Sequence, residues 1–191
     1  MKKIILLVSI FAFTSISCKA QHIIPVEDGY KYIATEDGFM GDKDYVYVKD
    51  INNYLPKFVG TWKGICNTKN YEFTITKTTT DDGELKEDIL LMRYKITDTN
   101  GTVIENTLSL SNDSPFVMKN GYMDRDGGYV FSYIGKNNKC GQNGWVFTQV
   151  YGNNNDKLQL FLQVEGETYP SCITGTATQI LPTDWIDLVK Y

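Results

Sequence analysis

Residues 71–79 read YEFTITKTT, and residues 156–165 read DKLQLFLQVE. In both stretches apolar and polar side chains alternate one by one, the pattern of a β-strand that buries one face. Leu158 and Leu160 would share one face, with Gln159 on the other. These stretches decide the fold class, because the same period of two recurs along most of the chain.

The alternation begins near residue 58 and continues almost to the C-terminus in short runs separated by turn residues. The runs predicted as strands are 58–66, 71–79, 87–97, 102–110, 128–135, 144–151, 156–165, 172–181 and 184–190. Asn100-Gly101 and Asn143-Gly144, between runs, accept positive φ and close hairpins. The series predicts an all-β, antiparallel up-and-down meander that closes into a small β-barrel. A β-sandwich is the alternative, because an open sheet would leave two exposed edges.

One short helical turn is predicted directly before the first of these strands. Asp50 can cap a turn in which Ile51, Leu55 and Phe58 follow at near-helical spacing, and Pro56 would stop it. We therefore expect the turn to open the folded domain.

The N-terminus has the pattern of a bacterial secretory signal. Lys2 and Lys3 precede the apolar run IILLVSIFAF at 4–13, which is too short to span a bilayer. Small residues then lead to Cys18, as in the lipobox of bacterial lipoproteins. We therefore predict a signal peptide over 1–17 and acylation of the Cys18 thiol.

This lipid would place the protein in the cell envelope, as an outer-membrane or periplasmic-face lipoprotein. The alternative is cleavage after Ala20, with a signal over 1–20 and a secreted, soluble product. In the lipoprotein interpretation, residues 18–49 form a tether and N-terminal extension, and residues 50–191 form the β-barrel domain.

The composition excludes several classes of partner. The chain has 19 Lys and Arg against 23 Asp and Glu, and loss of Lys2 and Lys3 with the signal leaves 17 against 23, a net charge of −6. These charges are scattered, which argues against nucleic acid and against a polybasic membrane patch. No second apolar run of spanning length follows residue 20.

The segment Lys57-Phe58-Val59-Gly60-Thr61-Trp62-Lys63 opens the first strong strand. It resembles the Gly-x-Trp motif of lipocalins and related barrels. This resemblance implies a lipocalin-like barrel in which Gly60 and Trp62 are structural rather than ligand-binding. Lipocalins also place an Arg on that Trp near the end of the barrel, and here no Arg follows Arg125.

The chain as a whole resembles an uncharacterised family of small exported proteins and lipoproteins from the Bacteroidota. The residues that carry the likeness are Ile23-Ile24-Pro25, the block from Phe58 to Lys63, and Leu181-Pro182-Thr183. The resemblance implies export and a shared fold, and it implies no activity.

Three cysteines remain after the signal region, so one intramolecular disulfide at most can form. Two strand reversals separate the loops that hold Cys140 and Cys172, which places both loops at the same end of a meander. We predict a Cys140–Cys172 disulfide and a free, largely buried Cys66. The alternative is that all three are reduced apolar fillers.

Catalytic residues are scarce, and we predict a noncatalytic protein without cofactor or metal. The one histidine, His22, lies in the predicted tether, so the domain lacks a Ser-His-Asp or Cys-His pair and a zinc-binding set. Asp124-Arg125-Asp126-Gly127-Gly128 has too few oxygen ligands for a calcium loop and is interpreted as a hairpin turn. Carboxylate-based catalysis remains the third-ranked hypothesis.

Aromatic side chains suggest a binding role. The rings expected to line the barrel interior are Tyr129, Phe131, Tyr133, Trp145, Phe147 and Tyr151. Such an interior could accept a small apolar ligand or a glycan, although the rings could instead fill the core. The first hypothesis is thus a binding module, and the alternative is an envelope protein-protein interaction domain with a fully packed core.

Overall fold

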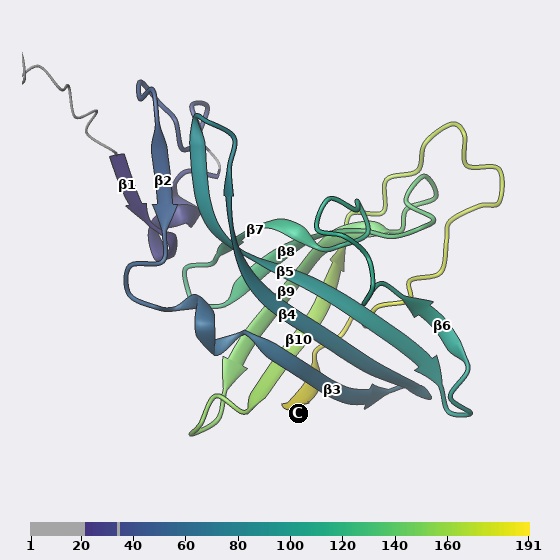
Figure 1. Ribbon diagram of the computed structural model, residues 1–191. Helices are drawn as coiled ribbons and strands as arrows, with labels where there is room; N and C mark the ends of the chain where they lie inside the picture. Colours follow the sequence, from purple (N-terminus) through teal and green to yellow (C-terminus); the bar gives the residue numbers. More distant parts are fainter. Residues whose placement is uncertain (1–21, 34) are drawn as a thin grey trace, which may run out of the picture.

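The computed structural model describes residues 22–33 and 35–191 (Figure 1). The predicted signal peptide, Cys18 and both predicted cleavage positions lie outside the described residues. Eleven strands form one sheet, and they are β1 (His22–Pro25), β2 (Val46–Lys49), β3 (Gly60–Cys66), β4 (Lys69–Asp81), β5 (Leu85–Asp98), β6 (Val103–Asn106), β7 (Lys119–Met123), β8 (Tyr129–Ile134), β9 (Asn143–Tyr151), β10 (Lys157–Val164) and β11 (Ile186–Lys190). The prediction of an all-β protein is confirmed.

The sheet contains two antiparallel meanders, β3-β4-β5 and β7-β8-β9-β10-β11, joined where β11 pairs with β3. Figure 1 shows β3, β4 and β5 crossing in front of β8, β9 and β10, so the two meanders face each other as layers. The sheet is not closed into a barrel. Within the described residues, an isolated bridge between Met92 and Met118 links β5 to the chain just before β7. The arrangement is therefore sandwich-like, which was the alternative prediction.

One predicted strand is wrong, and one observed strand was not predicted. Residues 172–181 form no strand, because Gly175 has a φ of +77° and the segment lies in the long β10–β11 loop, which extends away from the sheet in Figure 1. The sequence pattern also missed β7, where Asn120 has a φ of +53° and Gly121 interrupts the alternation. Gly121 is needed there, since a Cβ would lie 2.2 Å from the carbonyl oxygen of Val130.

The N-terminal segment is part of the sheet from residue 22 onward. After β1, the 3-10 helix η1 (Val26–Lys31) leads towards β2, and β2 pairs in parallel with both β1 and β5. Ile24, Val26, Val46 and Val48 are at most 6% exposed and belong to the main core. Residues 22–49, expected as an extension, therefore pack against the domain through two strands.

The predicted helical turn is confirmed as the 3-10 helix η2 (Leu55–Lys57). Pro56 lies inside this turn rather than after it, because the first turn of a helix needs no N–H from that position. The Trp62 ring is fully buried and donates its Nε1 proton to the carbonyl of Phe58 at 2.7 Å. Lys190 Nζ lies 5.0 Å from the Trp62 ring centroid, so a lysine occupies the face where the lipocalin resemblance implied an Arg.

A buried polar network fixes the turn and β2 to the β4–β5 hairpin. The Asp50 carboxylate accepts hydrogen bonds from the backbone N–H of Tyr54 at 2.7 Å and from Lys77 Nζ at 2.7 Å. Asp88 accepts the Asp50 backbone N–H at 3.0 Å and the Thr79 hydroxyl at 2.7 Å. Burial opposes ionisation of Asp88, but hydrogen bonds from Thr79 and Asp50 outweigh it and lower the pKa of the carboxyl.

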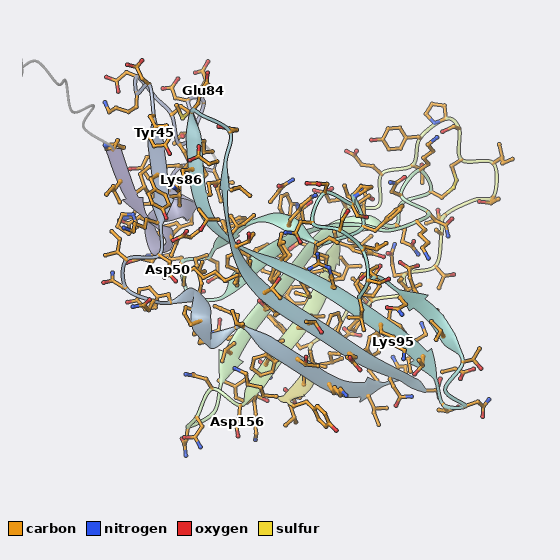
Figure 2. All side chains as sticks on the ribbon, in the orientation of Figure 1. Tyr45, Asp50, Glu84, Lys86, Lys95 and Asp156 are labelled. Carbon is orange, nitrogen blue, oxygen red and sulfur yellow. A yellow bond between two sulfur atoms is a disulfide. The ribbon has the colours of Figure 1, made fainter. Side chains whose placement is uncertain are left out.

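Replacing Asp50 should destabilise the fold through this network. Asp50→Ala leaves the Lys77 ammonium and buried backbone donors without their acceptor, so we expect the free energy of unfolding to fall by about 3 kcal/mol. The matched control is Glu84→Ala, an exposed carboxylate at the opposite end of β2 in Figure 2, which should change stability by less than about 0.5 kcal/mol. Urea titration followed by tryptophan fluorescence measures both, and equal stability of the two variants would contradict the network's role.

The Cys140–Cys172 disulfide is present, with the two Cα atoms 5.1 Å apart and a sequence separation of 32. It joins the β8–β9 loop to the β10–β11 loop at one end of the layers. Cys66 is free, as expected, but half-buried rather than largely buried. The long β10–β11 loop is thus attached to the domain near its middle.

Removal of the disulfide should lower stability through the unfolded chain. The double variant C140A/C172A frees a long loop of the unfolded state, so the free energy of unfolding should fall by about 3 to 4 kcal/mol in the chain-entropy model. Thermal unfolding with and without a reducing agent measures this. The wild type should lose stability on reduction and the double variant should not. An unchanged unfolding midpoint of the wild type under reducing conditions would refute the expectation.

Candidate functional site

The predicted interior rings divide into two groups. Tyr129, Phe131 and Tyr133 on β8 are at most 2% exposed and pack in the main core. Phe131 contacts Tyr129 with ring centroids 4.7 Å apart, and Tyr133 lies edge-on to Tyr94. Burial raises the pKa of the Tyr129 and Tyr133 hydroxyls. These three rings fill the interior, which was the alternative to a ligand-binding cavity in the sequence analysis.

Trp145, Phe147 and Tyr151 on β9 point outward, so the expectation of one shared interior is wrong for them. Along β9 these half-buried side chains alternate with buried ones, which face the core. The register pairs Phe147 with Val130, which lies on the opposite face of β8 from Tyr129. The sequence could not assign these faces, because both sides of β9 carry apolar side chains.

An aromatic row crosses the outer face of the second layer. We define the row by the residues that neighbour one another from β7 to the residue just before β11, namely Tyr122, Val130, Phe147, Phe161 and Trp185. Phe147 and Phe161 stack with centroids 5.1 Å apart, and Phe161 lies 4.3 Å from Trp185. Trp185 is 52% exposed, whereas Val130 is fully buried beneath its neighbours. The row is one residue wide, with Phe147, Phe161 and Trp185 in ring contact and the buried Val130 between Phe147 and Tyr122.

Polar side chains flank the row on the side of the C-terminal ends of β9 and β11. Gln149, Gln159 and Asp187 are paired across β9, β10 and β11. Asp187 Oδ1 accepts hydrogen bonds from Tyr151 at 2.8 Å and from Gln159 at 3.0 Å. The hydrogen bond from Tyr151, followed by that from Gln159, lowers the pKa of Asp187. This flank presents amides beside a carboxylate held in one orientation.

The opposite flank of the row contains a second fixed ring. Trp145 is paired with Ser132 on β8 and Gln163 on β10. Its Nε1 donates a hydrogen bond to Glu165 Oε1 at 2.7 Å, and its ring lies edge-on to Tyr122 with centroids 6.4 Å apart. Trp145 is therefore held by both polar and aromatic contacts.

Beside Trp145 and Tyr122 the surface is hollowed into a groove of about 650 Å³. One wall is the β4–β5 hairpin, which contributes Thr78, Thr80, Glu87, Ile89 and Leu91. The other wall is the chain before and through β7, which contributes Asn112, Asp113, Lys119, Asn120 and Tyr122. We call this hollow the groove.

Hydrogen bonds hold the second wall of the groove in place. Lys119 Nζ donates to the carbonyl of Asn112 at 2.7 Å, and Arg93 Nη2 donates to the Asn112 side chain at 2.6 Å. On the first wall, burial raises the pKa of Glu87, and the Asp82 carboxylate raises it further. Sequence reasoning missed the groove because its residues come from separate segments that only the fold brings together.

The described part of the chain has few other functional candidates. Among residues 22–33 and 35–191, no group of three or more His, Cys, Asp or Glu side chains is placed to hold a metal ion. None of the helices in these ranges has the length and apolar character needed to cross a bilayer.

Comparison with curated proteins and with solved structures gave no match. A family model matches residues 1–158, which include every residue that lines the groove, whereas Phe161 and Trp185 follow the matched segment. Because this match covers most of the sequence, the chain belongs to the Family of unknown function (DUF6705).

Proposed function

We propose that this protein is an exported, noncatalytic binding module whose ligand is a glycan held in the groove. The observation that carries the proposal is the groove itself, which combines about 650 Å³ of space with a lining of aromatic rings, Trp145 and Tyr122, and of polar and aliphatic side chains on both walls. That volume lies within the usual range for ligand sites, about 300 to 1,000 Å³.

The mixed lining favours a sugar over a purely apolar ligand. A sugar ring offers C–H faces to aromatic side chains and hydroxyls to polar ones. Thr78, Thr80 and Asn120 supply hydroxyl and amide groups, and Glu87 supplies a carboxyl group. The Lys119 ammonium already donates to a backbone carbonyl, so this cation is not reserved for an anionic ligand.

Export and a lipid on Cys18 complete the proposal. The basic start, the short apolar run and the small residues before Cys18 support an envelope lipoprotein, with secretion after Ala20 as the alternative. The Cys140–Cys172 disulfide fits an oxidising compartment.

A second candidate function is protein binding by the β10–β11 loop. Ile173 is 93% exposed and Tyr169 is 56% exposed, and the Cys140–Cys172 disulfide holds the loop between them. An exposed apolar side chain on a fastened loop can anchor a protein partner. This candidate and the groove predict different sensitive residues, so one set of variants separates them.

Variants of the groove should lose sugar binding. Affinity electrophoresis against neutral polysaccharides should show retardation of the wild type, and Trp145→Ala should weaken the retardation about tenfold because a stacking ring is lost. The control, Ile173→Ser in the exposed loop, should bind as the wild type does. If no glycan retards the wild type, or if Ile173→Ser is equally impaired, the groove is not a glycan site.

The lipid should be visible in the mature protein. Mass spectrometry of the membrane fraction should find a chain that begins at Cys18 with acyl groups attached, and Cys18→Ala should move the protein to the soluble fraction. A mature chain that begins at Gln21 would refute the anchor and favour the secreted alternative.

A further inference from the structure

We infer that the ligand is a neutral oligosaccharide chain, and that the aromatic row binds the part of the chain that leaves the groove. This inference rests on the proposed function of the groove and adds to it the class of ligand and a second subsite. The row lies on the outer face of the sheet and not in the interior, where the sequence analysis expected a ligand. It runs across the strands, perpendicular to their length.

The groove and the row are continuous. Tyr122 belongs to both, because it lines the groove and is the first residue of the row. From Tyr122 to Trp185 the row takes four steps between neighbouring strands, and at about 4.8 Å a step it extends about 19 Å. That length suits a chain of several sugar rings rather than a single one.

The side chains beside the row match the groups of a sugar chain. Phe147, Phe161 and Trp185 offer apolar surface to the C–H groups of sugar rings. Two residues away along the strands, and on the same face, Gln149 and Gln159 offer amide donors and acceptors to the hydroxyls of the sugar. Gln159 Nε2 already donates to Asp187, and an apolar ligand would offer these amides no further hydrogen bond, whereas a sugar offers hydroxyls to the amides and C–H groups to the rings.

The charges near the row favour a neutral chain. Asp187 stands on one flank and Glu165 accepts the Trp145 hydrogen bond on the other, so a carboxylate lies on each side of the row. These carboxylates would repel sulfated or uronic acid sugars and phosphate headgroups. On the Asp187 flank, Lys157 is paired with Tyr151, lies over the Tyr151 ring and is close enough for its charge to contribute to the lowered pKa of Asp187.

The rings and the flanking carboxylate are held before any ligand arrives. Phe161 is fixed between Phe147 and Trp185 by ring contacts of 5.1 and 4.3 Å. Two hydrogen bonds converge on Asp187 Oδ1. Binding would therefore order few side chains, and this lowers its entropic cost.

A protein partner fits the row less well. A standard protein interface buries about 800 Å² on each side around an apolar centre. The row is one residue wide, its member Val130 is fully buried, and polar residues follow on the flank. A second copy of the chain or another protein is therefore an outcome that the experiment must distinguish.

The test is the dependence of affinity on chain length. Titration calorimetry of the full mature protein should use neutral gluco-, xylo- and manno-oligosaccharides, from the monosaccharide to the hexasaccharide. For the series that binds, we expect affinity to rise with length in the wild type. Trp185→Ala should weaken hexasaccharide binding about tenfold and leave the monosaccharide unchanged, because Trp185 lies at the far end of the row.

Further variants separate this inference from the proposed function. Trp145→Ala should weaken every length, since the groove binds the first sugar, and Tyr169→Ala in the β10–β11 loop should change none. If the monosaccharide and hexasaccharide bind equally well and Trp185→Ala has no effect, the row is no subsite, although the groove still binds sugar. If no sugar binds at all, the proposed function fails as well.

Two other results would also overturn the inference. Tighter binding of a uronic acid oligosaccharide than of its neutral counterpart would contradict the neutral class. A wild type that is dimeric in sedimentation experiments and becomes monomeric on Trp185→Ala would assign the row to an interface between copies. The thermal midpoint of each variant should match the wild type, and Phe161→Leu, which keeps an apolar side chain but removes the ring, should reproduce the loss if Trp185→Ala does not fold.

Discussion

The pairing of β11 with β3 is the contact on which the sheet depends, because it joins the two meanders. The pairing is short, with Val189 opposite Lys63 and Lys190 opposite Trp62. Side-chain packing strengthens it, since Lys190 lies over the buried Trp62 ring. Gly64 permits the approach, because a Cβ there would come within 2.6 Å of the Asp187 carbonyl. The same strand places Asp187 beside the aromatic row, so the fold and the candidate site share one element.

Alternation of polar and apolar residues was enough to predict the strands and their antiparallel order where each strand buries a single face. It failed where local residues did not decide the outcome. β1 and β2 are short and pair in parallel, and the place of β2 next to β5 depends on Val46 and Val48 reaching a core built by distant strands. In residues 172–181 the sequence has strand-like residues, but the loop is fixed by Cys172 instead of a ladder.

The candidate site was less predictable than the fold. The six rings were recognised as important, but their faces depend on the register between β8 and β9, which places Phe147 opposite Val130. Alternation places Phe161 on the strand face opposite Leu158 and Leu160, but nothing in the local sequence connects it with Trp185, which lies in a later loop. The groove depends on the β4–β5 hairpin lying beside the chain before β7, an arrangement without any short-range signature.

The start of β1 at His22 has a consequence for how the protein would meet its ligand. Residues 19–21 are all that separate it from Cys18, and three residues span at most about 11 Å. A lipid on Cys18 would therefore hold the sheet close to the bilayer and restrict its rotation, which a long flexible linker would not do. Many such molecules on one membrane could then bind a single polymer at the same time. Their combined avidity would retain at the cell surface a glycan that dissociates quickly from each molecule alone.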